Sequence, residues 1–163
     1  MKYIYLMRHA KSDWTHEANS DYDRPLNHRG LTEAPKIGKE LRHRNILPEI
    51  FLSSPANRAR TTAQLVAGAA DFASDIVYLE HFYLGDIPKI LDTLHQLPNA
   101  FNSVLLVGHN PVWEQLVTLF TSEHNHVVMN TSTIAALQCD ANQWKDVYEG
   151  SCLLNWTLYA KDL

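Results

Sequence analysis

Short runs of apolar residues alternate along the chain with longer segments in which apolar residues recur every three or four positions. Four runs are nearly continuous in apolar character, as in strands covered on both faces of a sheet: residues 3–7, 50–52, 76–79 and 104–107. Segments with a helical period lie between and after these runs: residues 31–41, 59–66, 87–94 and 112–120. This alternation predicts an α/β domain.

The last third of the chain has a different pattern. Residues 133–139 and 152–160 are predicted strands, and the segment after the first, residues 140–143, is rich in turn-forming residues with no helix following it. We therefore expect an antiparallel hairpin at one edge of the sheet. Pro35 leaves two alternatives, because it lies either in the first turn of a helix capped by Thr32 or inside a helix that starts at Asn27.

The length, the net charge and the absence of certain motifs exclude several classes of protein. The 163 residues predict one domain spanning residues 1–163. With 14 Lys and Arg against 18 Asp and Glu, the net charge of −4 argues against a general nucleic-acid-binding protein. The sequence also lacks the Gly-rich segments GxGxxG and GxxxxGK, which argues against a nucleotide-binding module.

The two cysteines and the N-terminus bear on the cellular location. Cys139 and Cys152 are too few for a secreted disulfide framework, which favours reduced thiols. The apolar run at residues 3–7 ends at Arg8, so it is too short for a signal peptide or a membrane span. We therefore expect a cytoplasmic protein that has no contact with a membrane.

Basic side chains follow three of the four predicted parallel strands. Ligands of open α/β sheets bind beyond the carboxyl ends of the strands, so these connections are the candidate site. The three segments are "RHAKS" at residues 8–12, "SSPANR" at residues 53–58 and "GHNP" at residues 108–111. Together they would bring two arginines and two histidines to one edge of the sheet.

Two of these segments predict helix N-termini. Ser54 precedes Pro55 and Asn110 precedes Pro111, so each polar residue could cap a helix that begins with proline. Unpaired N–H groups and the helix dipole favour an anion there, and Arg58 would add a positive charge. A single arginine or histidine in such a place is usually solvated or structural. The convergence of several such residues is what predicts a phosphate site.

Four segments in this order resemble the histidine phosphatase superfamily, and within it the SixA-like phosphohistidine phosphatases: "LMRHAKSDW", "DYDRPLNHRG", "FLSSPANRARTTA" and "VLLVGHNP". The resemblance extends from Tyr3 to about Ala136 and includes "NTSTIAAL". It implies a three-layer α/β/α fold whose central sheet is mostly parallel, with an antiparallel C-terminal edge. It also implies that His9 is a nucleophile and that Arg8, Arg58 and His109 form a phosphate pocket.

These residue types suit phosphoryl transfer through a covalent phosphohistidine enzyme. A neutral His9 could attack phosphorus while a backbone carbonyl holds its other ring nitrogen. Arg8, Arg58 and a protonated His109 would surround the phosphoryl oxygens. Three fixed cations would replace a metal, so we expect no metal or other cofactor. The pair His124 and His126 has no further ligand at useful spacing, which argues against a metal site there.

The general acid is less clear from the sequence. Glu80 follows the third predicted strand and is a candidate, although an exposed glutamate with no such role is equally compatible with its position; Asp13 is a weaker candidate. Asn110 and Ser12 could donate further hydrogen bonds to phosphate. Lys11 could attract an acidic substrate, and Arg24 is expected to pair with a neighbouring carboxylate.

Several substrates fit this site. The connection between the second and third strands has room for one helix, which predicts an uncovered pocket that admits a phosphohistidine on a phosphotransfer or signalling protein. Inorganic phosphate would be the product, and we expect a monomer. A small-molecule phosphomonoesterase is the alternative within the same superfamily. A non-catalytic phosphate-binding module is a further alternative, which the presence of His9 disfavours.

Overall fold

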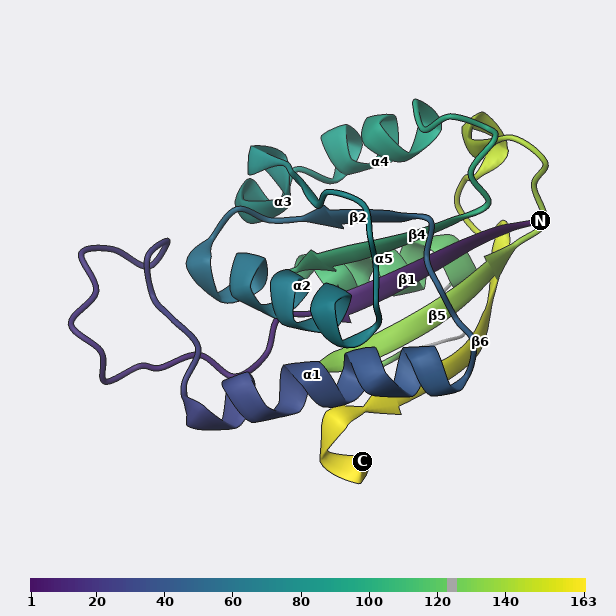
Figure 1. Cartoon of the computed structure of the whole chain (residues 1–163). Coiled ribbons are helices and arrows are strands. Elements are labelled where there is room, and N and C mark those ends of the chain that lie inside the picture. Colours follow the sequence, from purple (N-terminus) through teal and green to yellow (C-terminus); the bar gives the residue numbers. More distant parts are fainter. Residues whose placement is uncertain (123–125) are drawn as a thin grey trace.

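The computed structural model describes residues 1–122 and 126–163, and Figure 1 shows a mixed sheet at its centre. The strand order is β3-β2-β4-β1-β5-β6. The strands are β1 (Lys2–Arg8), β2 (Ile50–Ser53), β3 (Val77–Tyr78), β4 (Ser103–Gly108), β5 (Thr133–Cys139) and β6 (Cys152–Tyr159). The pairs among β3, β2, β4 and β1 are parallel, whereas β5 pairs antiparallel with both β1 and β6. This is the expected α/β fold with an antiparallel C-terminal edge.

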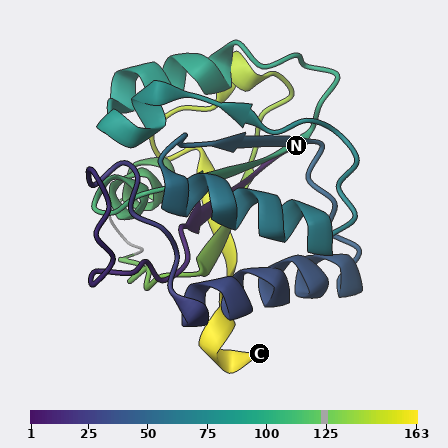
Figure 2. The ribbon, with the colours of Figure 1, turned by 60° about the vertical axis from the view of Figure 1, so that its left-hand side comes forward.

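Helices cover both faces of the sheet (Figures 1 and 2). Helices α1 and α2 pack on one face, and the remaining α-helices pack on the other. The helices are α1 (His28–His43), α2 (Asn57–Ala69), α3 (Glu80–Leu84), α4 (Ile87–His95) and α5 (Val112–Thr121), with short 3₁₀ turns at Trp144–Asp146 and Ala160–Asp162. None of these helices is long and apolar enough to cross a membrane, a finding that covers residues 1–122 and 126–163.

The central strands divide their side chains between two cores. In β1, Ile4 and Leu6 pack with α4 and α5, whereas Met7 packs with α1 and α2. Alternate residues of a strand point to opposite faces, so a strand buried on both sides must be apolar at nearly every position. This explains the continuous apolar runs of β1, β2 and β4.

The third predicted strand differs from the other three. Strand β3 has two paired residues, Val77 and Tyr78, and both are exposed. The expectation of a strand covered on both faces is therefore wrong here, because β3 lies at the sheet edge and pairs only with the end of β2. The short helix α3 that follows it was not predicted.

Helix α1 resolves the two alternatives for Pro35. Asn27 caps the helix by accepting a hydrogen bond from the Gly30 N–H at 2.9 Å, and Pro35 lies inside the helix. The alternative with Thr32 as the cap is therefore wrong.

The C-terminal hairpin forms as predicted from β5 and β6, but its cysteines differ from expectation. Cys139 and Cys152 are joined by a disulfide, so the expectation of reduced thiols is wrong. Strand register explains the bond, because Cys139 lies directly opposite Cys152 in the β5–β6 pair. The connection between the strands is longer than the predicted turn and includes the buried Trp144.

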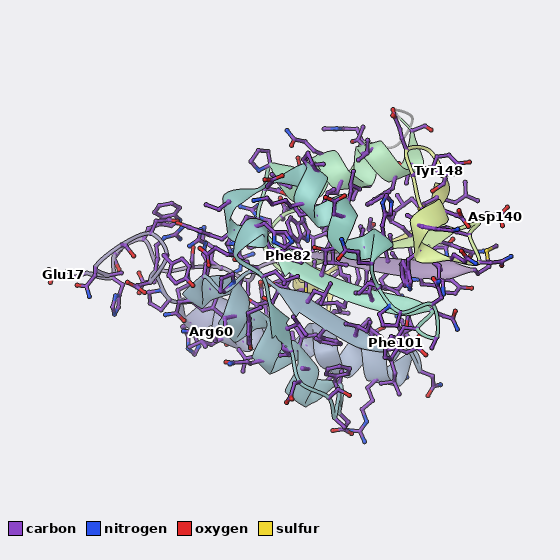
Figure 3. The ribbon with its side chains drawn as sticks, turned by 90° about the horizontal axis from the view of Figure 1, so that it is seen from above. Glu17, Arg60, Phe82, Phe101, Asp140 and Tyr148 are labelled. Atoms are coloured by element: carbon purple, nitrogen blue, oxygen red, sulfur yellow. A yellow bond between two sulfur atoms is a disulfide. The ribbon has the colours of Figure 1, made fainter. Side chains whose placement is uncertain are left out.

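The carboxyl ends of β1, β2 and β4 point to the same end of the molecule, on the left in Figure 1, and the N-terminus lies at the other end. The connection between β1 and α1 projects beyond the sheet on this side. In Figure 3, Glu17 of that connection and Asp140 of the hairpin connection mark opposite ends of the molecule. The predicted site residues follow the strands at the Glu17 end.

Candidate active site

A pocket of about 280 Å³ lies where the strand-end segments meet. Its walls come from the residues after β1, the β1–α1 connection, the start of α2 and the residues after β4. The lining residues are Arg8, His9, Lys11, Ser12, Trp14, Asp21, Arg24, Arg58, His109, Asn110 and Thr131. Positively charged and imidazole side chains predominate, and Asp21 is the one carboxylate among these lining residues.

His9 is held in a fixed orientation within the pocket. Its side chain is 6% exposed, and Nδ1 lies 2.7 Å from the Ala10 carbonyl oxygen. A carbonyl can only accept, so Nδ1 carries the proton and Nε2 keeps its lone pair. Burial lowers the His9 pKa well below 6.5. The hydrogen bond to the Ala10 carbonyl raises the pKa, but His109 and the nearby arginines lower it further. His9 is therefore a neutral imidazole at pH 7.

Helix α2 fixes the backbone next to His9. Thr62 Oγ1 accepts the Ala10 N–H at 2.9 Å and donates to the Arg58 carbonyl at 2.7 Å. The residue after His9 is thereby tied to the helix that carries Arg58. Sequence reasoning did not single out Thr62, because a buried threonine one helical turn after an arginine has no distinctive signal.

His109 faces His9 at a ring-centroid distance of 5.2 Å. Its Nε2 lies 2.7 Å from Ser54 Oγ, which accepts the Ala56 N–H at 3.2 Å. Burial and the charge of Arg58 lower the His109 pKa to about 4. In the free protein the imidazole is therefore neutral at pH 7, whereas the expected protonated His109 refers to the site with a phosphoryl group bound and stays a prediction.

Arg58 is positioned by Asp21. One guanidinium nitrogen donates to the Asp21 carbonyl oxygen at 2.8 Å and another to Asp21 Oδ2 at 3.0 Å. Asp21 also accepts hydrogen bonds from Arg24 at 3.1 Å and from Tyr83 Oη at 3.0 Å. These donors outweigh the effect of burial and lower the Asp21 pKa to about 2. Asp21 is therefore ionised and engaged, and it is not available as a proton donor at neutral pH.

Arg8 is positioned from the opposite side. Its Nη1 donates to the Met129 carbonyl at 3.0 Å, and burial lowers the Arg8 pKa while Glu114 opposes that effect. Glu114 accepts the Met129 N–H at 2.8 Å and the Asn110 amide at 3.0 Å. Helix α5 thus supports the Arg8 side of the pocket through Glu114.

Four buried donors of residues that line this pocket have no hydrogen-bond partner within residues 1–122 and 126–163: Arg8 Nε, Arg24 Nε, Arg58 Nε and His109 Nδ1. A buried polar group without a partner costs about 1–3 kcal/mol, so such groups are rare unless a ligand completes them. A tetrahedral oxyanion offers acceptors to several donors at once. The pocket therefore fits a phosphoryl group.

Comparison with known proteins agrees with this chemistry. Residues 4–82 match the model of the histidine phosphatase superfamily (branch 1). The structure of the protein histidine phosphatase SixA complexed with tungstate is similar over 98% of both chains, with a TM-score of 0.86 and 26% identity. The structure described as phosphohistidine phosphatase SixA from Agrobacterium tumefaciens is 30% identical over 97% of both chains, with a TM-score of 0.79. The chain belongs to the histidine phosphatase superfamily.

Within the superfamily it belongs to the SixA-like branch, and it is a phosphatase. The resemblance that its four motifs carry is therefore confirmed. The uncharacterized Mycobacterium tuberculosis protein MT1313 is 31% identical over 157 residues, which cover 91% of this chain and 96% of that protein.

The structure brings most of the predicted site residues of this histidine phosphatase together. Arg8, His9, Ser12, Lys11, Arg58, His109 and Asn110 all line the pocket. Arg24 pairs with Asp21 as expected and also lines the pocket, where it donates a hydrogen bond to Ser12 Oγ. The additional contact of Asp21 with Arg58 was missed, because a loop residue far from its partner in sequence follows no periodic pattern.

Two candidate acids do not line the pocket. Glu80 is exposed in the first turn of α3, and the half-buried Asp13 accepts hydrogen bonds from Thr15 through its carboxylate. Asn110 does line the pocket, but its amide nitrogen already donates to Glu114 and to the Met129 carbonyl at 2.9 Å. Ser12 Oγ already accepts from Arg24 and keeps its own proton for donation.

Both predicted helix caps are displaced. Helix α2 has Ala56 as its N-cap residue, and α5 has Pro111; neither makes a side-chain capping bond. Ser54 instead contacts His109, and Asn110 contacts Glu114. The helices therefore begin after the expected caps, because the two polar side chains serve the pocket and its supporting bonds.

No group of three His, Cys, Asp or Glu residues suited to a metal gathers in the part of the chain that the structure describes. His124, one half of the His-x-His pair, lies outside the described residues.

Proposed function

We propose that this phosphatase removes phosphoryl groups from histidine side chains of a protein, through a covalent phosphohistidine at His9. The observation that carries the proposal is the buried, neutral His9 whose Nδ1 is held by the Ala10 carbonyl. Nε2 is thereby the nitrogen with a lone pair, next to donors without partners among the described residues. This is the arrangement that a nitrogen nucleophile at phosphorus requires.

The reaction has two displacement steps. His9 Nε2 forms a bond to phosphorus while the bond from phosphorus to the substrate nitrogen breaks, and the leaving imidazole keeps the electron pair and takes a proton from solvent. Water then attacks the phosphorus of phospho-His9, the bond to Nε2 breaks, and inorganic phosphate and neutral His9 are released. Arg8 and Arg58 stabilise the charge on the phosphoryl oxygens in both steps.

His109 takes part as a hydrogen-bond donor. When Ser54 donates its hydroxyl proton to Nε2, the ring proton lies on Nδ1, the atom without a partner among the described residues. Nδ1–H can then bind a phosphoryl oxygen. A bound dianion favours the charged imidazole, so substrate binding raises the His109 pKa from about 4.

The pocket's lack of an acid supports a phosphohistidine substrate. Asp21 is the only carboxylate among the described lining residues, and its pKa is about 2. An alkyl ester must expel an alkoxide and benefits from a general acid by about 10²–10⁴-fold, whereas imidazole is a good leaving group near neutral pH. Breaking a P–N bond therefore makes fewer demands on this site than breaking an ester bond.

Access to the pocket supports a protein substrate. Between β2 and β3 the chain forms one helix, α2, as predicted, so no inserted segment from this connection covers the pocket. Trp14 lines the pocket and is 72% exposed, which leaves an aromatic surface at the entrance. A histidine on the surface of another protein can therefore reach His9. A cytoplasmic location and a monomeric state remain predictions.

The test is phosphate release from a phosphohistidine-bearing protein in the presence of excess chelator. We expect the wild type to release phosphate and His9→Ala to be at least roughly 10⁴-fold slower, as for loss of a nucleophile. Brief incubation with labelled substrate should label the wild type and leave His9→Ala unlabelled. Faster turnover of sugar phosphates than of phosphohistidine would favour the phosphomonoesterase alternative, and undiminished activity of His9→Ala would exclude the mechanism.

A further inference from the structure

A second pocket of about 240 Å³ adjoins the catalytic pocket. Thr131 lines both, so the two spaces meet at one residue. The other main lining residues of the second pocket are Arg29, Asn130, Thr133, Tyr159 and Lys161. They come from the start of α1, from the turn before β5 and the first residue of β5, and from the end of β6 and the 3₁₀ turn that follows it. The second pocket therefore lies on the hairpin side of the catalytic pocket.

Two cationic side chains line the second pocket, and one of them is paired with a carboxylate outside the lining. Arg29 and Lys161 line it, and no acidic residue is among the described lining residues. Arg29 Nε donates to Glu33 Oε1 at 2.8 Å, which orients the guanidinium and leaves its two outer nitrogens outside this bond. Lys161 forms no ion pair within residues 1–122 and 126–163, so it brings an uncompensated positive charge to this pocket of a chain whose net charge is −4.

A buried hydroxyl points to the same kind of ligand. Thr133 lines the second pocket and is fully buried, and its Oγ1 has no partner within residues 1–122 and 126–163. In the free protein no hydrogen bond compensates for the cost of removing this hydroxyl group from water. A ligand with a hydrogen-bond acceptor would provide that bond. A carboxylate is such an acceptor and also suits the two cations.

The turn before β5 fixes this pocket relative to the nucleophile. Ser132 has a φ of 59°, and its N–H donates to the His9 carbonyl oxygen at 3.2 Å. The left-handed conformation of a serine is uncommon and persists where surrounding contacts hold it. A group bound beside Thr131 therefore has a defined position relative to a phosphoryl group on His9.

We propose that the second pocket binds an anionic side chain of the substrate protein, a carboxylate close to the phosphohistidine. This inference rests on the proposed function and adds a requirement on the substrate sequence. The catalytic pocket recognises the phosphoryl group, which every phosphohistidine has in common. The second pocket distinguishes an acidic neighbourhood from a neutral one.

The test uses matched peptides that contain one phosphohistidine, with glutamate or glutamine at a scanned neighbouring position. For the wild type, kcat/KM should be about 5–10-fold higher for at least one glutamate peptide than for its glutamine counterpart, since two partly exposed charge contacts are each worth up to about 1 kcal/mol. The preference should shrink as salt increases. A peptide with phosphoserine at the same position tests whether a second phosphoryl group binds in place of the carboxylate.

Variants locate the preference. Lys161→Gln and Arg29→Gln should each reduce the glutamate-to-glutamine ratio, and together they should bring it near one. Lys145→Gln is the matched control, because Lys145 is an exposed lysine in the 3₁₀ turn of the hairpin connection, at the end of the molecule marked by Asp140 and Tyr148 in Figure 3. It should keep the wild-type ratio.

Thr133→Val should affect stability and substrate preference differently. Removing a buried hydroxyl without a partner should leave the free energy of unfolding unchanged or raise it, while lowering the glutamate preference. A threonine with a purely structural role would not change that preference.

Peptide binding to His9→Ala separates the two proposals. If neither peptide is hydrolysed by the wild type, the proposed function is wrong; the affinity of His9→Ala for the glutamate and glutamine peptides still tests the second pocket. Equal rates and equal affinities for the two peptides at every position would overturn the inference. So would a preference that Lys161→Gln and Arg29→Gln leave intact.

Discussion

Each end of β1 carries a cationic side chain, and the two side chains differ in how many of their hydrogen bonds the protein itself completes. Lys2 is 1% exposed, and its Nζ donates to the carbonyls of Asn99 and Phe101 and to Asn102 Oδ1 at 2.7–3.0 Å. Arg8, at the other end, keeps a buried Nε without a partner in the described part of the chain. The amino end completes its own hydrogen bonds, whereas the carboxyl end leaves donors for a ligand.

This difference separates a structural cation from a binding one. Burial and charge are common to Lys2 and Arg58, so neither property identifies a site. The distinguishing feature is whether the protein itself supplies enough acceptors. At the carboxyl end the unpaired donors are fixed by Asp21 and Met129 before any ligand arrives. Such preorganisation is what makes donors effective in stabilising a transition state.

Arg58→Ala removes Nε, which has no partner among the described residues, together with the two hydrogen bonds that the guanidinium donates to Asp21. We expect kcat to fall by about 10²–10³-fold, as for the loss of one contact to a developing oxyanion. Thermal unfolding should change little in comparison, because Arg58 donates to the partly exposed Asp21. A kinetic loss that merely followed a loss of folded protein would contradict the comparison. Asp21→Asn is the positioning control, expected to weaken activity less than Arg58→Ala.

Lys2→Met is the matching change at the amino end. It leaves the carbonyls of Asn99 and Phe101 without their donor, so the free energy of unfolding should decrease by about 2 kcal/mol. That is roughly a 30-fold change in the unfolding constant. Urea unfolding measures the loss, and kcat per folded molecule should stay at the wild-type value. A change in kcat of folded Lys2→Met would show that the two ends are coupled.

The sequence predicted the parts of the fold that have a strong period. Strands β1, β2 and β4 are apolar on both faces, and the alternation with helices identified the parallel part of the sheet. The carboxyl-end rule then placed Arg8, His9, Arg58 and His109 together, as the pocket shows. These inferences depend on local patterns and on a general property of open sheets.

The features that were missed depend on partners distant in sequence. The disulfide requires the register of β5 against β6, and the exposure of β3 requires knowing that it lies at the edge. Asp21 holds Arg58 from a connection without periodicity. The prediction of Ser54 as a helix cap was wrong for a related reason. Its hydroxyl contacts His109, a residue distant in sequence that a local capping rule does not consider.

Ser54→Ala tests whether a donor at the carboxyl end of β1 must be held in place, because it keeps His109 but removes the hydroxyl group that positions it. The change deletes the hydroxyl at His109 Nε2 and leaves the imidazole in place. Loss of one buried hydrogen bond, at about 1 kcal/mol, predicts an approximately fivefold decrease in kcat. Ser54→Thr keeps a hydroxyl and should restore part of the rate if the branched side chain fits. Equal rates for wild type and Ser54→Ala would show that Ser54 does not position His109.

Protonation of His109 should have the smallest effect on the rate at neutral pH. It is also the most direct test of whether the carboxyl end of β1 is arranged to bind an anion. In the folded protein the His109 pKa is lowered to about 4, mainly by burial and then by Arg58, whereas an unfolded histidine titrates near 6.5. As the pH falls from 6.5 towards 4, the unfolded chain therefore takes up a proton that the folded chain does not. The free energy of unfolding should decrease over that window and should be insensitive to His109 above it. The lowered His9 pKa acts in the same direction.

Bound phosphate should reverse part of this effect, because an anion beside Nδ1 favours the imidazolium form. Titration of the His109 ring resonances by NMR should therefore give a midpoint near 4 in the free protein and a higher midpoint at saturating phosphate. Phosphate should also raise the melting temperature, since it binds the folded state alone. A His109 midpoint near 6.5 in the free protein, unchanged by phosphate, would contradict the contrast between the two ends: the carboxyl end would then already carry its charge without a ligand.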